Sequence, residues 1–198
     1  MSITSSMVKE LREKTGAGMM DCKEALTKCG GDFEKAIDHL RKKGMSAATK
    51  RSSKAAKDGV IASYIHMGGK IGVLVELNCE TDFVAKTDDF RLLAKELTMH
   101  VAAANPRYLK PEDIPHDVLE REKEIYRSQA MAEKKPEKIW DKIIEGKLKK
   151  YYEDVCLLDQ KFIKDTAVTV GTLVSNMIAK TGENIVIRRF VRFQLGTD

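Results

Sequence analysis

The sequence lacks the features that mark secreted and membrane proteins. It contains no run of eighteen apolar residues, so no segment is expected to span a membrane. Residues 1–6 have neither the apolar core of a secretion signal nor the arginine-rich character of a transit peptide. With 42% hydrophobic and 33% charged residues, the composition is that of an ordinary soluble globular protein. We therefore expect a cytoplasmic protein with no membrane partner.

Cysteine and histidine are sparse and scattered. The four cysteines, Cys22, Cys29, Cys79 and Cys156, form no C-x-x-C pair, and no histidine lies at the spacing of a zinc site. We expect reduced thiols, as in other cytoplasmic proteins, and no bound metal. Cys22 and Cys29 are seven residues apart, on one face of a helix, and we interpret both as small core residues.

The sequence also offers little from which an enzyme active site could be built. Gly16–Gly18 lacks the rest of any phosphate-binding loop and follows a helical pattern, so we interpret it as a turn between helices. No serine or cysteine lies in a nucleophile elbow or beside a paired base. Asp88 and Asp89 are adjacent at the expected start of a helix. Carboxylates there more often interact favourably with the positive end of the helix dipole than hold a metal. We expect neither catalysis nor a cofactor.

Residues 1–45 are expected to form a bundle of three short helices. The second helix ends at Gly30-Gly31, a pair typical of helix C-termini. Asp32 is a good N-cap for the third, whose apolar residues recur at helical spacing until Gly44, where we expect it to end. Residues 46–57 are small and basic without an apolar period. They are either a flexible linker or a transient helix, and in both cases they separate two folding units.

Residues 58–198 are expected to form an α+β core. Val60–Met67 and Ile71–Cys79 are β-rich runs on either side of a glycine pair that predicts a hairpin, and a third run covers Ile185–Leu195. The intervening helices should pack on one face of this small antiparallel sheet. They are expected at His116–Lys135, Pro136–Cys156 and about Val168–Thr181, after one that carries Phe90, Leu92, Leu93, Leu97 and Val101 toward the sheet.

Positive charge is concentrated toward the amino terminus. Residues 1–57 hold 13 Lys/Arg against 7 Asp/Glu, and residues 41–57 contain seven bases and no acid. Such a run could bind nucleic acid. It has no aromatic residue on which bases could stack, which favours a solvated linker. A nucleic-acid-binding accessory protein is therefore the alternative function.

Two segments indicate surfaces that bind a partner protein. In the first, Asp82 and Phe83 lie where an alternating strand pattern ends and a helical pattern begins. A purely structural interpretation is that a threonine caps the helix and Phe83 fills the core. In the second, Met19 and Met20 follow a glycine-rich turn. Adjacent helical residues point about 100° apart, so at least one methionine should be exposed, and flexible thioethers are common at binding surfaces.

Three segments resemble the translation elongation factor Ts family, in the order in which that family carries them. They are Met7–Gly44, Gly72–Ala85 with its Asn-Cys-Glu-Thr-Asp-Phe-Val stretch, and Gly182–Phe193. The resemblance implies a guanine-nucleotide exchange factor that binds elongation factor Tu in its GDP-bound and nucleotide-free states. It also implies that residues 1–45 form a module like the ubiquitin-associated (UBA) fold, which docks on the partner's G domain.

The resemblance further implies roles for individual residues. The Thr-Asp-Phe-Val motif would disturb the partner's magnesium site, so that Mg²⁺ and then GDP leave. The motif is Thr81, Asp82, Phe83 and Val84, and the contact residues of the module are Arg12, Met19, Met20 and Lys23. An adaptor that binds ubiquitin-like folds through the module is a further alternative, but it leaves the motif without a purpose.

The chain departs from the longer members of that family, which carry two core subdomains and an inserted coiled-coil hairpin. Here one core is expected, and only residues 116–156 could take the place of the hairpin. Short members resemble dimers in which a second copy replaces the duplicated half. We therefore expect residues 58–198 to form a dimerisation domain, the protein to be a homodimer, and nucleic acid not to be a direct partner.

Overall fold

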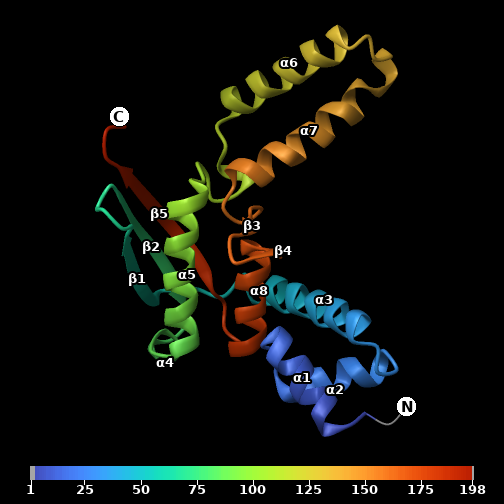
Figure 1. The fold of residues 1–198 in the computed structure, drawn as a ribbon, viewed down its shortest axis with the longest axis vertical. Coiled ribbons are helices and arrows are strands. Elements are labelled where there is room, and N and C mark those ends of the chain that lie inside the picture. The colour runs from blue at the N-terminus through green and yellow to red at the C-terminus, as the bar shows by residue number, and fades with distance from the viewer. Residues whose placement is uncertain (1–2, 198) are drawn as a thin grey trace.

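The computed structural model describes residues 3–197 as a three-helix module, a sheet with helices on one face, and a projecting helical hairpin (Figure 1). The α+β class predicted from the sequence is confirmed. The elements of the amino-terminal part are α1 (Ser5–Thr15), α2 (Met19–Lys28) and α3 (Phe33–Arg51). They are followed by β1 (Asp58–Ile65), β2 (Ile71–Cys79), α4 (Asp82–Ala85), α5 (Asp88–Ala104), η1 (Pro111–Asp113), α6 (His116–Ala132), η2 (Glu137–Ile139), α7 (Trp140–Val155), β3 (Lys161–Phe162), β4 (Asp165–Thr169), α8 (Val170–Thr181) and β5 (Val186–Gln194).

In the module, side chains cap the starts of α1 and α3. The Thr4 hydroxyl accepts the N–H of Met7, and the Asp32 carboxylate accepts the N–H of Lys35. Its apolar core is separate from that of the sheet and is formed by Val8, Leu11, Cys22, Ala25, Leu26, Ala36 and Leu40. Cys22 is fully buried there, and burial raises the pKa of its thiol. All four cysteines of the chain are free thiols.

Helix α3 does not end at Gly44, as the sequence predicted, but continues to Arg51. Its second half lies against α8, and Gly44 sits at the contact. A Cβ atom at this position would lie 3.5 Å from the Asn176 side chain and 3.7 Å from the Ser175 carbonyl oxygen. The glycine therefore marks a close approach of two helices. Packing on α8 stabilises a helical segment whose own apolar pattern is too weak to predict it.

The three-stranded sheet has the order β1-β2-β5, and both pairings are antiparallel. The hairpin predicted between β1 and β2 is confirmed, and its turn contains Gly68 and Gly69 with φ of 86° and 69°. Such left-handed backbone is readily adopted only by glycine. A second, two-stranded sheet of β3 and β4 was not predicted, because strands this short carry no periodic signal.

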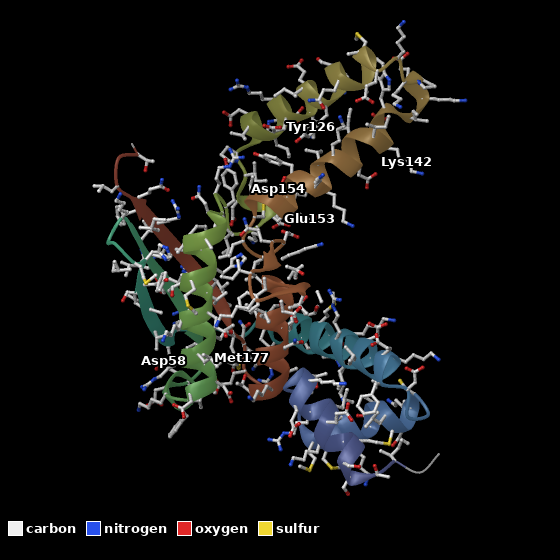
Figure 2. All side chains as sticks on the ribbon, in the orientation of Figure 1. Asp58, Tyr126, Lys142, Glu153, Asp154 and Met177 are labelled. Atoms are coloured by element: carbon white, nitrogen blue, oxygen red, sulfur yellow. The ribbon has the colours of Figure 1, made fainter. Side chains whose placement is uncertain are left out.

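The face of the sheet that meets α5 holds the main core. The buried residues are Val73, Val75 and Leu77 on β2, and Phe90, Leu93, Leu97 and Val101 on α5. Leu92 was also expected on this face but is 53% exposed. Its neighbour Leu93 takes the inward position, and adjacent helical residues point about 100° apart. Helix α8 lies beside α5, with Met177 between them (Figure 2).

Helices α6 and α7 form a hairpin that projects away from the sheet (Figure 1). The buried face of α7 consists of Ile144, Leu148, Tyr151 and Val155. Among residues 3–197 no helix combines the length and the apolar character that crossing a lipid bilayer requires.

Candidate partner-binding site

Strand β2 leads into a sharp corner that is fixed by two threonine caps. The Thr81 hydroxyl accepts the N–H of Val84 at 3.5 Å and caps the single turn of α4. The Thr87 hydroxyl accepts the N–H of Phe90 at 3.3 Å and caps α5. Two helix starts within six residues leave the chain little freedom here, so side chains at the corner project from a stiff support.

Phe83 projects from this corner into solvent and is 80% exposed. The interpretation that it fills the core is therefore wrong. Two positions later Ala85 is buried, and the intervening Val84 packs against the core. Because these two residues anchor the inner side of α4, Phe83 is directed outward. An exposed phenylalanine forgoes about 1.5–3 kcal/mol of hydrophobic stabilisation, which becomes available to a partner that buries it.

Asp82, beside Phe83, is not a free carboxylate. It accepts a hydrogen bond from the ammonium group of Lys86, one helical turn later. This bond lowers the pKa of Asp82 below its ordinary value, so the carboxylate is ionised at neutral pH. The pair is solvent-exposed, and exposed pairs of this kind contribute little to stability. Asp82 can therefore exchange Lys86 for polar groups of a partner at small cost.

A buried cysteine also holds the inner side of the corner by a hydrogen bond. Cys79, the last residue of β2, is buried, and its thiol donates to the Thr81 carbonyl oxygen at 3.1 Å. Burial, with the nearby carboxylates of Glu183 and Asp58, raises the pKa of this thiol to about 11, so it stays protonated. Asp58 pairs with Cys79 across the β1–β2 ladder and lies at the corner's end of the sheet (Figure 2).

Sequence reasoning missed two residues that bind this corner from far along the chain, Glu183 and Asn184. Their partners, Glu80 and Thr81, lie 102 to 104 positions earlier. The only local signal was Gly182, which follows the helix expected up to Thr181 and ends α8 with φ of 72°. The resemblance covered this segment as the start of a closing strand but implied no role for its acidic residue.

The module presents a second exposed surface around the turn between α1 and α2. Met19 and Met20 are 55% and 73% exposed, which confirms that at least one methionine faces solvent and shows that both do. Arg12, near the end of α1, and Lys23, on α2, are also exposed. The four candidate contact residues of the module are thus all available to a partner.

Ion pairs hold α2 against α3 beneath this surface. Lys43 contacts Asp21 at 2.9 Å and Glu24 at 2.6 Å. Hydrogen bonds from Lys28 and Lys43 lower the pKa of Glu24 to about 2. Lys43 belongs to the acid-free run, and so does Arg51, which lies 3.6 Å from Glu80. The run therefore reaches acids elsewhere in the chain, which reduces the charge available for nucleic acid.

The two exposed surfaces lie toward the same end of the molecule. Along its longest axis, α4 and the module are both at the end opposite the α6–α7 hairpin (Figure 1). A single partner could therefore contact both at once. Within residues 3–197, no three His, Cys, Asp or Glu side chains gather in a way that could hold a metal ion.

The outer face of the sheet, opposite α5, carries a cluster of exposed apolar residues and is covered by none of the described helices (Figure 1). We call this surface the outer sheet face. Register places Leu74 beside Val191, and Gly72 between Ile65 and Phe193. Ile65 and Phe193 are 66% and 67% exposed. Large contiguous apolar patches on protein surfaces mark interaction sites.

Comparison with known proteins gives full-length matches. A family model described as "Elongation factor TS" matches residues 2–197. A protein named elongation factor Ts from Syntrophus aciditrophicus is 77% identical over 198 residues, which is all of this chain and 98% of that relative. Proteins of the same name from Desulfosudis oleivorans and Thermodesulfovibrio yellowstonii are 56% and 60% identical over 98% and 99% of this chain, and 98% of each relative is covered. These relatives therefore have nearly the same length as this chain.

Proposed function

The chain belongs to the elongation factor Ts family, and on this premise we propose that it is a guanine-nucleotide exchange factor for elongation factor Tu. It binds the GDP form, promotes release of Mg²⁺ and then GDP, and leaves the nucleotide-free protein ready for GTP during translation elongation. It works in the cytoplasm, changes no covalent bond and needs no cofactor. The observation that carries the proposal is Phe83, held in solvent on a capped corner.

Binding free energy drives the exchange. The factor binds empty elongation factor Tu more tightly than the GDP–Mg²⁺ form, and by linkage nucleotide and factor weaken each other's binding equally. A thousandfold faster release requires about 4 kcal/mol at the barrier, whereas burial of one phenylalanine yields about 1.5–3 kcal/mol. Burial of Phe83 alone is therefore insufficient, and the docked module must contribute further binding free energy. The proposal accordingly divides the chain into a docking module (1–45), a basic connection (46–57) and a core (58–198).

Disturbing the partner's bound magnesium ion is an efficient way to promote release of GDP. Mg²⁺ demands near-octahedral oxygen coordination, so small displacements of its supporting groups weaken it strongly. In this proposal Phe83 opens the packing beside the ion, while Asp82 leaves Lys86 and competes for polar groups around it. Thr81 and Val84 support the wedge as the cap and the inner anchor of α4.

The direct test is to add the protein to elongation factor Tu loaded with fluorescent GDP. We expect release to accelerate by several orders of magnitude, as followed by stopped-flow fluorescence. A variant in which Arg41, Lys42, Lys50, Lys54 and Lys57 are replaced by glutamine should behave like the parent. Failure of the parent to accelerate release would contradict the proposal. A salt-sensitive affinity for RNA that disappears in the variant, together with no exchange, would favour the nucleic-acid alternative.

The module's methionines are expected to act mainly on association. Replacing Met19 and Met20 with alanine should weaken binding to elongation factor Tu about tenfold, since each loses apolar area that the partner would bury. Release of GDP from the preformed complex should change much less. Titration by calorimetry and single-turnover release measure the two effects separately. Both side chains are exposed, so unfolding is not expected, and normal affinity would contradict a docking role.

We further propose that the protein is a homodimer in which a second copy covers the outer sheet face. Residues 3–197 contain one such sheet, and its outer face combines exposed apolar residues with the Arg189–Glu76 ion pair at 2.7 Å toward one end. The same surface on two copies can meet about a twofold axis, because an isologous interface needs only a self-complementary patch. Two sheets stacked in this way pack about 10 Å apart.

A further inference from the structure

Glu183 binds the corner that carries Phe83 through three hydrogen bonds to one carboxylate. Its Oε2 accepts the backbone N–H groups of Glu80 at 3.1 Å and Thr81 at 3.0 Å. Its Oε1 accepts the Thr81 hydroxyl at 2.6 Å. Hydrogen bonds to an ionised acceptor are about twice as strong as neutral ones. The corner is therefore held by a residue that comes from the end of α8.

The contact is reciprocal. The N–H of Asn184 donates to Oε1 of Glu80 at 2.6 Å, while the N–H of Glu80 donates to Glu183. We call Glu80, Thr81, Glu183 and Asn184 the clasp. Gly182, in the left-handed conformation, ends α8 and turns the chain toward the corner. The clasp thus joins the end of β2 to the end of α8 by hydrogen bonds in both directions.

The clasp also contacts the end of α3 and the residues just after it. Helix α3 starts in the module. The Asn184 side-chain amide donates to the Lys54 carbonyl oxygen at 2.7 Å. The Arg51 guanidinium lies 3.6 Å from the Glu80 carboxylate. The segment that runs from the docking module and the corner that bears Phe83 therefore meet at the same four residues.

The clasp controls the cap of α4 through one hydroxyl group. Because the Thr81 hydroxyl donates its proton to Glu183, an oxygen lone pair is left to accept the N–H of Val84. Without the carboxylate, this hydroxyl can rotate and two backbone N–H groups lose their acceptor. The corner then loses its fixed direction, although Cys79 and Ile185 on either side remain buried in the core.

Resting on the proposed function, we propose that Glu183 is a positioning residue for nucleotide release. It acts through Thr81 to hold Phe83 in one direction relative to the docked module. Phe83 can displace groups of the partner only if the corner that carries it stays rigid. A functional site whose residues are positioned about 1 Å too loosely loses much of its activity. Glu183 does not itself enter the partner's nucleotide site.

The test measures GDP release from elongation factor Tu at a series of factor concentrations, which separates the maximal rate from the half-saturating concentration. Glu183→Ala should lower the maximal rate about tenfold and change the half-saturating concentration less than twofold. Glu183→Gln should recover most of the rate, because its amide oxygen still accepts the backbone N–H groups. Glu145→Ala, a matched change at an exposed position of α7, should have no effect.

A double-variant cycle distinguishes positioning from a general loss of structure. If Glu183 acts through Phe83, adding Glu183→Ala to Phe83→Ala should cost little more than Phe83→Ala alone. If the reductions in maximal rate caused by Glu183→Ala and Phe83→Ala multiply in the double variant, the two residues act independently and the inference is overturned. So would a normal maximal rate for Glu183→Ala, or a glutamine variant as slow as the alanine one. A normal rate for Phe83→Ala would instead contradict the proposed function, and a slow Phe83→Ala beside a normal Glu183→Ala would overturn only the role of the clasp.

Discussion

Replacing Phe83 with alanine is expected to slow GDP release from elongation factor Tu by about ten- to a hundredfold. The range follows from the burial of one phenylalanine side chain, about 1.5–3 kcal/mol, applied to the transition state for release. The substitution should leave the factor's own stability almost unchanged, because the side chain is 80% exposed. Stopped-flow fluorescence at saturating factor concentration measures the rate.

Two further variants make this result specific. Asp82→Ala should slow release less, because the carboxylate must first leave Lys86 and gains only the difference between two exposed contacts. Met131→Ala removes another exposed apolar side chain, at the end of α6, and should leave the rate unchanged. Unchanged release with both Phe83→Ala and Asp82→Ala would show that the corner is not the element that disturbs the magnesium site.

The sequence was sufficient for features that are set locally. Alternating apolar residues predicted β1, β2 and β5, and glycine pairs marked the hairpin turn and the end of α2. These signals depend on backbone sterics and on a side-chain period of two, both of which act over a few residues. The N-cap threonines were likewise readable, since a capping side chain reaches a backbone N–H only two or three positions away.

Features set by distant contacts could not be read in this way. The continuation of α3 past Gly44 depends on α8, and the clasp joins residues about a hundred positions apart. The candidate site shows the same division. Its residues were identified by motif, but whether Phe83 faced the core or solvent depended on which side of α4 was anchored by Val84 and Ala85. A short apolar run does not determine this orientation.

Introducing one charge into the outer sheet face is expected to separate the homodimer into monomers. Phe193 is 67% exposed, so Phe193→Glu should not disturb the fold of the single chain. In the dimer the new carboxylate would be buried against the apolar residues of the second copy, and by symmetry each interface would contain two of them. An uncompensated buried charge costs far more than an interface of this kind gains from one phenylalanine.

Sedimentation velocity provides the measurement. The parent should sediment as twice the 22.2 kDa chain, and Phe193→Glu as the single chain at the same micromolar concentration. Met131→Glu, a matched change of an exposed apolar residue on the α6–α7 hairpin, should remain dimeric. A parent that is monomeric throughout would contradict the homodimer, and a dimeric Phe193→Glu would place the interface elsewhere. If Phe193→Glu is monomeric but still releases GDP at the parent's rate, one copy's corner and module are sufficient for exchange, and the second copy serves only to cover the sheet.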